Sequence, residues 1–297
     1  MSAAFADRLI DAVRRKDTPL CVGLDPFPEK IPALFGDARE EMTALERFGE
    51  AIVSIAAQHA GVLKPQLGLF EPFGPDGVRI AQEIVTEARA AGMAVILDAK
   101  RGDIGTTAEG YARATLGPTP GFDADCVTVN PYLGKDSLEP FLALAEREHK
   151  GVAVLVRTSN PGARDLQDLS VNGAPLWESV AAMVSGASAR LRGESGWSGL
   201  MAVAGATYPD EARRLRTLLP DTLFLVPGYG AQGAGAADAV AGFVKKSKGR
   251  EGGVVSSSRA ITYPAAAQTA KTLDQWRTAI SDAMAATAAE LRTACAA

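Results

Sequence analysis

The residues best suited to chemistry lie in one short stretch, which reads Asp98-Ala-Lys100-Arg-Gly-Asp103. It ends an apolar run typical of a buried strand. Residues two apart on a strand share a face, so we expect the Asp98 and Lys100 side chains to project together. Charged side chains are seldom buried unless they are paired or functional. Flanking carboxylates favour the protonated form of Lys100, which predicts a positioned general acid; a structural ion-pair network is the alternative.

Two further charged residues end earlier apolar runs. Lys64 stands within residues 61–66 (GVLKPQ), and Asp25 ends residues 20–25 (LCVGLD). Lysines and aspartates that alternate around one rim are harder to explain by packing than one charge, because each must compensate the lost hydration of the others. An aspartate before proline often only starts a turn, so both interpretations of Asp25 stay open.

Two segments late in the chain indicate phosphate binding. Residues 228–235 read GYGAQGAG, and residues 252–259 read GGVVSSSR, which ends on Arg259. The first contains the GxGxxG pattern of dinucleotide-binding folds, but no ribose-binding acid follows at the expected spacing, so we reject that assignment. Glycines let backbone N–H groups approach an anion, and an arginine can bind it through paired hydrogen bonds. We therefore expect a local phosphate site.

Two polar segments allow more than one interpretation. Residues 158–162 (TSNPG) follow an apolar run and could hydrogen-bond a planar heterocycle, or they could form only a capping turn. Thr107 could be an N-terminal helix cap. The residues alone do not decide between these roles.

Short apolar runs recur along the chain with helical periodicity between them, as in buried parallel strands that alternate with helices. A doubly wound open sheet uses the same alternation, but eight units favour closure into a single (β/α)8 barrel, a TIM barrel, over residues 1–297. Carboxyl ends of such strands carry the active site. The eight runs are 20–25, 61–66, 94–100, 126–131, 152–159, 200–206, 223–228 and 253–259.

The remaining segments decorate this barrel. We expect a helix over about residues 4–15 to cap its bottom and the alanine-rich tail from about residue 264 to form a packed helix pair. Residues 26–44 and 160–198 are the least regular, and both follow carboxyl ends of predicted strands. They are the candidate active-site loops.

Composition excludes several classes of protein. The 297 residues carry a net charge of −4, which gives no global attraction to nucleic acid or anionic membranes. Three scattered cysteines and two histidines provide neither a disulfide framework nor a histidine-rich metal site. The N-terminal segment lacks the apolar run of a signal peptide, and no stretch is long enough to span a membrane. We expect a cytoplasmic enzyme without cysteine-, histidine- or metal-based machinery.

The motifs in their order resemble orotidine 5′-monophosphate decarboxylase, most closely its longer-chain bacterial group. The resemblance covers about residues 20–262 and rests on GLDP, LKPQ with FE, DAKRGDIG, VTVNPYLG, TSNPG, PGYGAQG and SSSRAI. It implies a metal-free and cofactor-free homodimeric barrel that converts orotidine monophosphate to UMP and CO2 in pyrimidine synthesis.

The resemblance also implies roles for individual residues. Lys100 would protonate C6 of the pyrimidine, Asp98 would lie near the departing carboxylate, and Lys64 would bridge Asp98 and the ribose. The resemblance places the remaining residues around the substrate: Asp103 and Thr107 would reach into the partner subunit's site, Asp25 would bind a ribose hydroxyl, Ser159 the pyrimidine edge, and Gly230, Gln232 and Arg259 the phosphate. Residues 163–198 lack a clear counterpart in compact members, so the resemblance assigns them no role.

Three other functions remain to be tested. Related barrels that act on 3-keto-gulonate 6-phosphate use magnesium, which Lys64 opposes because a cation at that rim repels a metal ion. A Schiff-base aldolase would need a neutral Lys64 or Lys100, which the flanking aspartates oppose. A non-catalytic sensor of phosphorylated ligands would keep the phosphate site without turnover.

Overall fold

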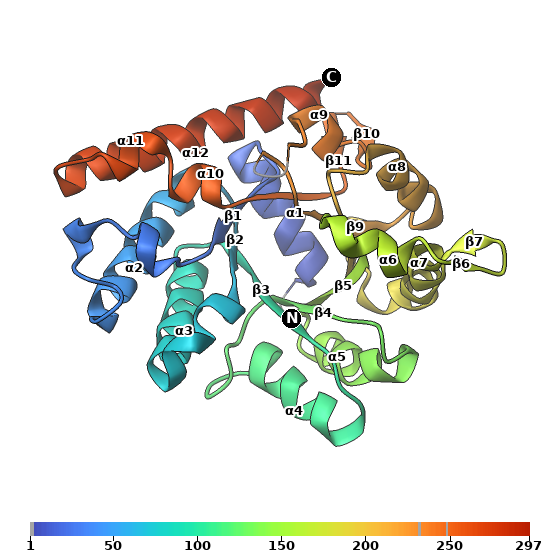
Figure 1. Ribbon diagram of the computed structural model, residues 1–297. Coiled ribbons are helices and arrows are strands. Elements are labelled where there is room, and N and C mark those ends of the chain that lie inside the picture. Colours follow the sequence, from blue (N-terminus) through green and yellow to red (C-terminus); the bar gives the residue numbers. More distant parts are fainter. Residues whose placement is uncertain (1–2, 231–232, 248) are drawn as a thin grey trace.

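Eight parallel strands close into a barrel in the computed structural model, which describes residues 3–230, 233–247 and 249–297. Around the barrel the strand order is β1-β12-β9-β8-β5-β4-β3-β2. The barrel closes because β1 and β12, the first and last barrel strands in the sequence, pair with each other. Figure 1 shows the strands at the centre and the helices around them. The predicted closed barrel is confirmed and the open-sheet alternative is wrong. The barrel strands are β1 (Leu20–Leu24), β2 (Val62–Pro65), β3 (Ala94–Arg101), β4 (Cys126–Val129), β5 (Gly151–Arg157), β8 (Ser198–Ala204), β9 (Thr222–Val226) and β12 (Gly253–Ser257).

Helices fill the connections between these strands. Their apolar stripes face the outside of the barrel and form one continuous core with it, which includes Phe48 and Ile52 of α2 and Ile80 and Ile84 of α3. The longer helices are α1 (Phe5–Lys16), α2 (Met42–His59), α3 (Gly74–Ala90), α4 (Gly105–Leu116), α5 (Lys135–Arg147), α7 (Leu176–Ala187), α8 (Pro209–Leu218) and α12 (Leu273–Ala296). Single-turn helices are α6 (Arg164–Gln167), α9 (Ala236–Ala239), α10 (Arg259–Thr262) and α11 (Ala265–Gln268). Short 3-10 turns cover Pro28–Lys30, Ala33–Phe35, Leu67–Leu69, Glu71–Phe73, Pro161–Ala163 and Ser188–Leu191.

The barrel interior changes from apolar to polar along four of the strands, β2, β3, β4 and β12. A second, separate core cluster fills the lower part with residues such as Val62, Ile96, Cys126 and Val254. Because strand side chains alternate between faces, the residues two positions later also point inward. They are polar and lie one layer higher, toward the carboxyl ends: Lys64, Asp98, Thr128 and Ser256.

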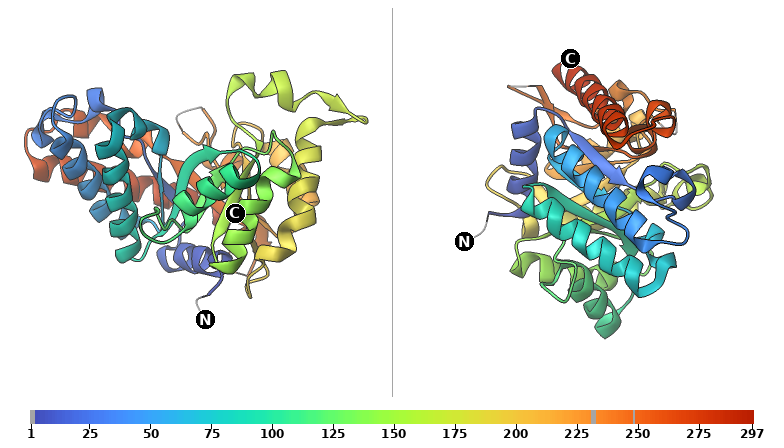
Figure 2. Two further views of the ribbon diagram at one scale, coloured as in Figure 1. Left: turned by 90° about the horizontal axis from the view of Figure 1, so that it is seen from below. Right: turned by 90° about the vertical axis from the view of Figure 1, so that its left-hand side faces the viewer.

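Helix α1 closes the bottom of the barrel, as predicted. Phe5, Leu9 and Ile10 belong to the interior cluster, and the Phe5 ring lies so close to Gly151 and Gly199 that a Cβ at Gly151 would come within 2.2 Å of it. In Figure 2 (left), α1 lies at the end of the barrel away from the projecting β6–β7 hairpin.

Two predicted segments differ in detail from the structure. The alanine-rich tail forms two helices of very unequal length that contact each other: α11 is a single turn, and α12 is one long helix that packs on α2 and places Trp276 in the core. The segment 160–198 contains α6, α7 and a small hairpin of β6 (Ser170–Val171) and β7 (Ala174–Pro175), which projects from the rim in Figure 1. A second hairpin pairs β10 (Val244–Lys246) with β11 (Gly249–Glu251). Among the described helices, none combines the length and apolar character that a bilayer crossing needs.

Candidate active site

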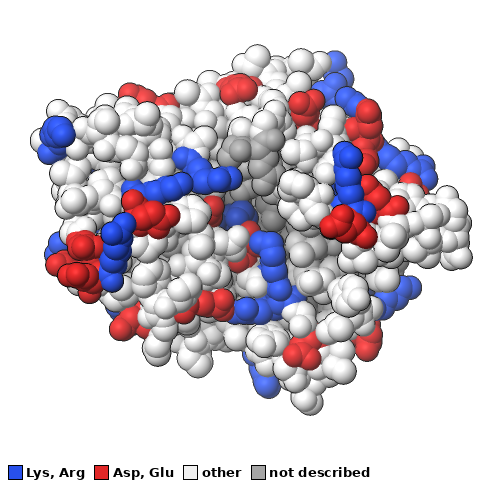
Figure 3. Space-filling model, in the orientation of Figure 1, with Lys and Arg blue, Asp and Glu red and all other residues white. Residues whose placement is uncertain are grey.

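A cavity of about 1120 Å³ opens at the carboxyl ends of the barrel strands. Figure 3 shows a hollow at the centre of this face with both lysine or arginine and aspartate or glutamate atoms in it. The lining includes six predicted site residues, which are Asp25, Lys64, Asp98, Lys100, Ser159 and Arg259. The fold therefore brings together residues that are as much as 234 positions apart in the sequence.

Asp98 is the centre of a charged cluster that it forms with Lys64 and Lys100. Each of its carboxylate oxygens accepts two hydrogen bonds. Oδ2 accepts from Lys64 Nζ at 2.8 Å and from Gln66 Nε2 at 3.2 Å. Oδ1 accepts from Lys100 Nζ at 2.6 Å and from Thr128 Oγ1 at 2.9 Å. The sequence predicted the two lysines but missed Gln66 and Thr128; strand alternation from Lys64 and from the interior residue Cys126 would have indicated both.

The charges in this cluster stabilise one another against burial. The side chains of Lys64 and Asp98 are each only 9% exposed. Burial alone would raise the pKa of Asp98, but the ammonium groups of Lys64 and Lys100 hold that pKa well below its usual range. Burial would likewise lower the pKa of Lys64, but the carboxylates of Asp98 and Asp25 raise it well above its usual range. Lys64 and Asp98 are therefore an ion pair at neutral pH.

Lys100 reaches Asp98 by a different backbone route from the one predicted. Simple strand alternation does not hold here, because Lys100 has φ +46° and the β3–β4 pairing shifts register between Leu97 and Arg101. This left-handed conformation is uncommon for a residue with a long side chain. It turns the Lys100 side chain toward the cavity, where it is 48% exposed and free to meet a ligand.

Asp25 presents a carboxylate oxygen to the same cavity. Its Oδ2 accepts a hydrogen bond from Ser258 Oγ at 2.6 Å, whereas Oδ1 is buried and has no partner among the described residues. Gly23 permits this approach of β1 to β12, because a Cβ there would lie 2.6 Å from Ser258 Cβ. A buried oxygen without a partner costs free energy unless a ligand supplies a donor. The geometry favours a ligand-binding role for Asp25 over a turn.

Some of the residues predicted to bind phosphate lie at the cavity. Arg259 begins α10, lines the cavity and makes no ion pair among the described residues. Gly228, which has φ +95°, also lines it, whereas the exposed Gly230 lies beside the lining. Gln232 lies outside the described residues. The glycine-rich segment does not open a long helix, since α9 is one turn.

The residues after β5 are held by a network that the sequence did not predict. Arg157 is fully buried and pairs with Asp168 at 3.1 Å and with Glu211 of α8. Gln167 accepts from the Thr158 backbone N–H at 3.0 Å and donates to the Thr158 hydroxyl at 2.8 Å. This network fixes Ser159 at the cavity wall, where the sequence placed it.

An apolar wall faces the charged cluster across the cavity. It comes from the irregular segment after β5, residues 160–198, which was predicted to be a candidate active-site loop without individual residues being named. The wall contains Leu166, Leu176, Trp177, Val180 and Met183. Since α7 packs on β5 and β8, this wall is part of the barrel, not a detached loop.

Asp103 and Thr107 do not line the cavity of their own chain. Asp103 is half-buried and accepts a hydrogen bond from the Ile104 backbone N–H at 2.8 Å. Thr107 is exposed and is the third residue of α4, so it is not the helix cap. Large apolar side chains are exposed around them, at Ile104, Tyr111, Tyr132 and Leu133.

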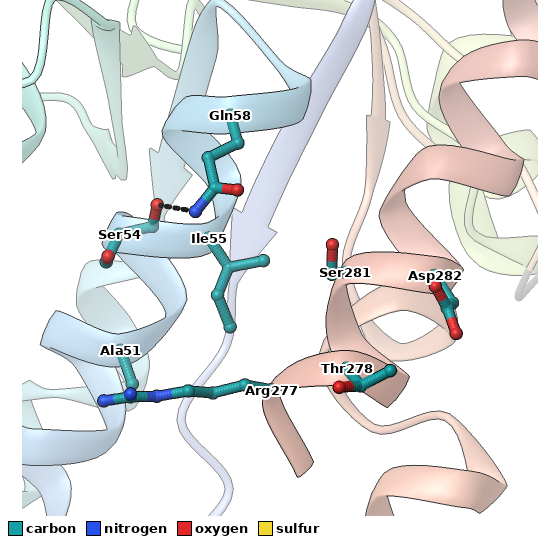
Figure 4. Close-up of a pocket in the computed structure, with 8 residues that line it drawn as sticks. All are labelled: Ala51, Ser54, Ile55, Gln58, Arg277, Thr278, Ser281 and Asp282. Atoms are coloured by element: carbon teal, nitrogen blue, oxygen red, sulfur yellow. Dashed lines mark hydrogen bonds between the residues drawn. The ribbon is translucent and has the colours of Figure 1, made fainter. Parts of the chain in front are cut away.

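A second, smaller pocket of about 390 Å³ lies in the outer helical layer between α2 and α12. Figure 4 shows that its walls carry Gln58 and Ser54 on one helix and Arg277, Ser281 and Asp282 on the other. It contains no member of the charged cluster. Among residues 3–230, 233–247 and 249–297, no group of three histidine, cysteine, aspartate or glutamate side chains could hold a metal ion.

The fold and the site define a (β/α)8-barrel enzyme whose mouth carries alternating lysine and aspartate residues. The family model described as "Orotidine 5'-phosphate decarboxylase / HUMPS family" matches residues 18–273. The chain therefore belongs to that family.

Proteins named orotidine 5'-phosphate decarboxylase are similar to it over most of their length. That of Haloarcula marismortui is 44% identical over 87% of each chain, and that of Rhodopirellula baltica is 40% identical over 87% of this chain and 88% of its own. A solved structure described as a putative orotidine 5'-phosphate decarboxylase from Streptomyces avermitilis superposes with a TM-score of 0.80. The two chains are 35% identical, and the superposition covers all of this chain and 97% of the Streptomyces avermitilis chain.

Proposed function

We propose that this chain decarboxylates orotidine 5′-monophosphate to UMP and CO2, the closing step of pyrimidine nucleotide synthesis. Family membership and curated relatives that carry this activity in their names support the reaction. The observation that carries the proposal is Asp98 held between the ammonium groups of Lys64 and Lys100 inside the cavity.

The chemistry of the reaction calls for such a cluster. Loss of CO2 from C6 of the pyrimidine leaves an electron pair with no adjacent electron sink, so the site must stabilise that charge and supply a proton. An ammonium held in place does both, and we assign this role to Lys100. The C6–carboxylate bond breaks, CO2 leaves, and the C6 electron pair takes a proton from Lys100 Nζ. Asp98 would lie beside the departing carboxylate, with Lys64 between Asp98 and the ribose.

The rest of the cavity fits the rest of the nucleotide. Asp25 Oδ1, which has no partner within the described part of the chain, suits a ribose hydroxyl, and Ser159 suits a polar edge of the pyrimidine. Arg259 suits the phosphate through paired hydrogen bonds, and Gly230 and Gln232 of the adjacent loop would complete that site. Phosphate contacts far from C6 would supply binding energy that the transition state uses.

We propose that two chains form a homodimer that shares its active sites. Asp103 and Thr107 do not line their own cavity, and the exposed apolar side chains beside them suit an interface between copies. Each chain would then complete its partner's cluster of alternating charges. We place the enzyme in the cytoplasm, where nucleotide synthesis takes place.

No metal or cofactor is part of this proposal. Both oxygens of Asp98 already accept a hydrogen bond from an ammonium group, so a magnesium ion would have to displace Lys64 or Lys100. This separates the proposal from the magnesium enzymes that resemble it. The protonated state of Lys64 also opposes Schiff-base chemistry.

The test is to mix the purified chain with orotidine monophosphate in EDTA and to follow the ultraviolet change to UMP. The proposal predicts rapid loss of the substrate band without added metal. Turnover that requires magnesium would place the chain with the metal-dependent relatives. Tight binding without turnover would indicate a sensor.

A further inference from the structure

Thr128 occupies an unusual position beneath the charged cluster. It lies on β4, is 1% exposed, and contacts both the side chain of Asp98 and the backbone of Lys100. Its hydroxyl accepts from the Lys100 backbone N–H at 2.9 Å and donates to Asp98 Oδ1 at 2.9 Å. A hydroxyl with a donor on one side and a carboxylate on the other has its hydrogen directed to the carboxylate.

The bond to the Lys100 backbone replaces a bond of the barrel. The β3–β4 pairing shifts register between Leu97 and Arg101, so the Lys100 N–H donates to a side chain instead of a strand carbonyl. Lys100 also has φ +46°, which its neighbours must hold in place. Thr128 thus helps to stabilise the backbone conformation that directs the Lys100 side chain into the cavity.

The four donors to Asp98 differ in how freely they move. The Lys100 side chain is half exposed and must leave Asp98 when it delivers a proton to a substrate. Thr128 is buried on a strand and has a short side chain, so its bond to Oδ1 persists when Lys100 leaves. A substrate carboxylate would repel Asp98, and a carboxylate free to turn away would relieve that repulsion.

We propose that Thr128 is a positioning residue for decarboxylation. Its hydroxyl keeps the Asp98 carboxylate and the Lys100 backbone in the same relative position while Lys100 Nζ moves to the substrate. The proposal rests on the proposed function, because it assigns Thr128 to the same reaction. Thr128 itself acts through Asp98 and Lys100 and not on the pyrimidine.

The test compares three variants in the orotidine monophosphate assay. Thr128→Val keeps the shape and removes the hydroxyl, so kcat should fall roughly 10- to 100-fold while KM stays within about threefold. Thr128→Ser keeps the hydroxyl and should recover most of the rate. Thr222→Val is the matched control, since Thr222 is a fully buried barrel threonine whose hydroxyl has no partner among the described residues; it should match wild type.

Three results would overturn the proposal while wild type remains active. These are a Thr128→Val kcat within about twofold of wild type, a Thr128→Ser rate as low as that of Thr128→Val, and an effect confined to KM. If Thr128→Val does not fold, Thr128→Cys keeps a similar volume with a weaker donor and should show the same loss of kcat. Wild type that leaves orotidine monophosphate unchanged would instead contradict the proposed function.

Discussion

At the scale of single residues, the site is organised around one carboxylate that cannot take up a proton at neutral pH. Asp98 has two ammonium partners and two neutral donors, so its charge is fixed and its plane is held. A general base would need a pKa near the working pH, and Asp98 has the opposite shift. In the proposed mechanism its role is therefore electrostatic, and we assign proton delivery to Lys100.

The ion pair of Asp98 and Lys64 predicts how stability depends on pH. The folded-state pKa of Asp98 is depressed, so its contribution to the free energy of unfolding is present above the unfolded value of about 4 and is lost as pH falls toward the folded value. The folded-state pKa of Lys64 is raised. Its contribution to the free energy of unfolding is therefore present below the unfolded pKa of about 10.4 and is lost as pH rises through the folded-state pKa.

Asp98→Asn should therefore lower the free energy of unfolding by about 3 kcal/mol at pH 7, because it leaves Lys64 buried without its main partner. Urea denaturation at pH 7 and pH 3 measures the difference between wild type and variant. We expect that difference to shrink at pH 3. A difference that grows as pH falls would contradict the sign of the Asp98 shift.

Arg259 predicts a separation between binding and turnover. Loss of its guanidinium in Arg259→Ala should raise KM about 100-fold, because two charge-assisted hydrogen bonds to the phosphate disappear, and should lower kcat less than about tenfold. Steady-state kinetics with orotidine monophosphate measure both. The control is Arg277→Ala, an exposed arginine on α12 at the other pocket. An unchanged KM in Arg259→Ala would remove this residue from the phosphate site.

At the scale of elements, strand alternation explains most of what the sequence could predict. An apolar run that ends in a charged residue places that charge at the barrel mouth, which is why Asp25, Lys64 and Asp98 were found from the sequence alone. Lys100 was correctly assigned to the barrel mouth, but strand alternation alone does not explain its position. Its side chain reaches the mouth through a positive φ that accompanies the register shift between β3 and β4. A register shift depends on how two strands pair, so the sequence of one strand does not predict it.

The network around Arg157 could not be predicted for a related reason. Its partners Asp168 and Glu211 are 11 and 54 positions away, on a loop and on a different helix. A buried arginine at the end of a strand indicates that partners exist, but only the packing of α6 and α8 identifies them. The segment 160–198 was predicted to lie at the active site, but its individual wall residues could not be identified, because α7 has the periodicity of any core helix.

The Arg157 network predicts an effect on the segment after β5. Asp168→Ala removes one partner of Arg157, so residues 161–175 should exchange their amide hydrogens faster and KM should rise about threefold with little change in kcat. Asp165→Ala is the control, because Asp165 is exposed in the same turn and makes no ion pair among the described residues. Hydrogen exchange read by mass spectrometry checks the prediction. Equal exchange in the two variants would contradict it.

At the scale of the whole molecule, the sequence predicted the closed barrel because eight repeating strand–helix units favour closure over a doubly wound open sheet. What it could not show is how the two candidate residues outside the cavity take part. Asp103 and Thr107 lie beside exposed apolar side chains on one flank of the barrel. The proposed site shared between two chains would account for this position.

Mixing two inactive variants should restore activity if sites are shared. Lys100→Ala and Asp103→Ala change the two halves of one site, so a dimer with one chain of each carries one intact site. After unfolding and refolding of an equal mixture, about a quarter of wild-type activity should return, because half of the dimers are mixed and each has one good site. Sedimentation should give twice the 30.9 kDa mass of the chain. No recovery from a mixture that forms mixed dimers would contradict the shared site.

We propose that Lys100 supplies the proton and charge stabilisation for a metal-free decarboxylation. The most direct measurement is the rate of UMP formation by Lys100→Ala in EDTA, beside wild type and the exposed-lysine control Lys271→Ala. The claim predicts that Lys100→Ala loses at least about 1000-fold in kcat while it still binds UMP and stays folded, and that Lys271→Ala keeps the wild-type rate. A Lys100→Ala rate near that of wild type would contradict it.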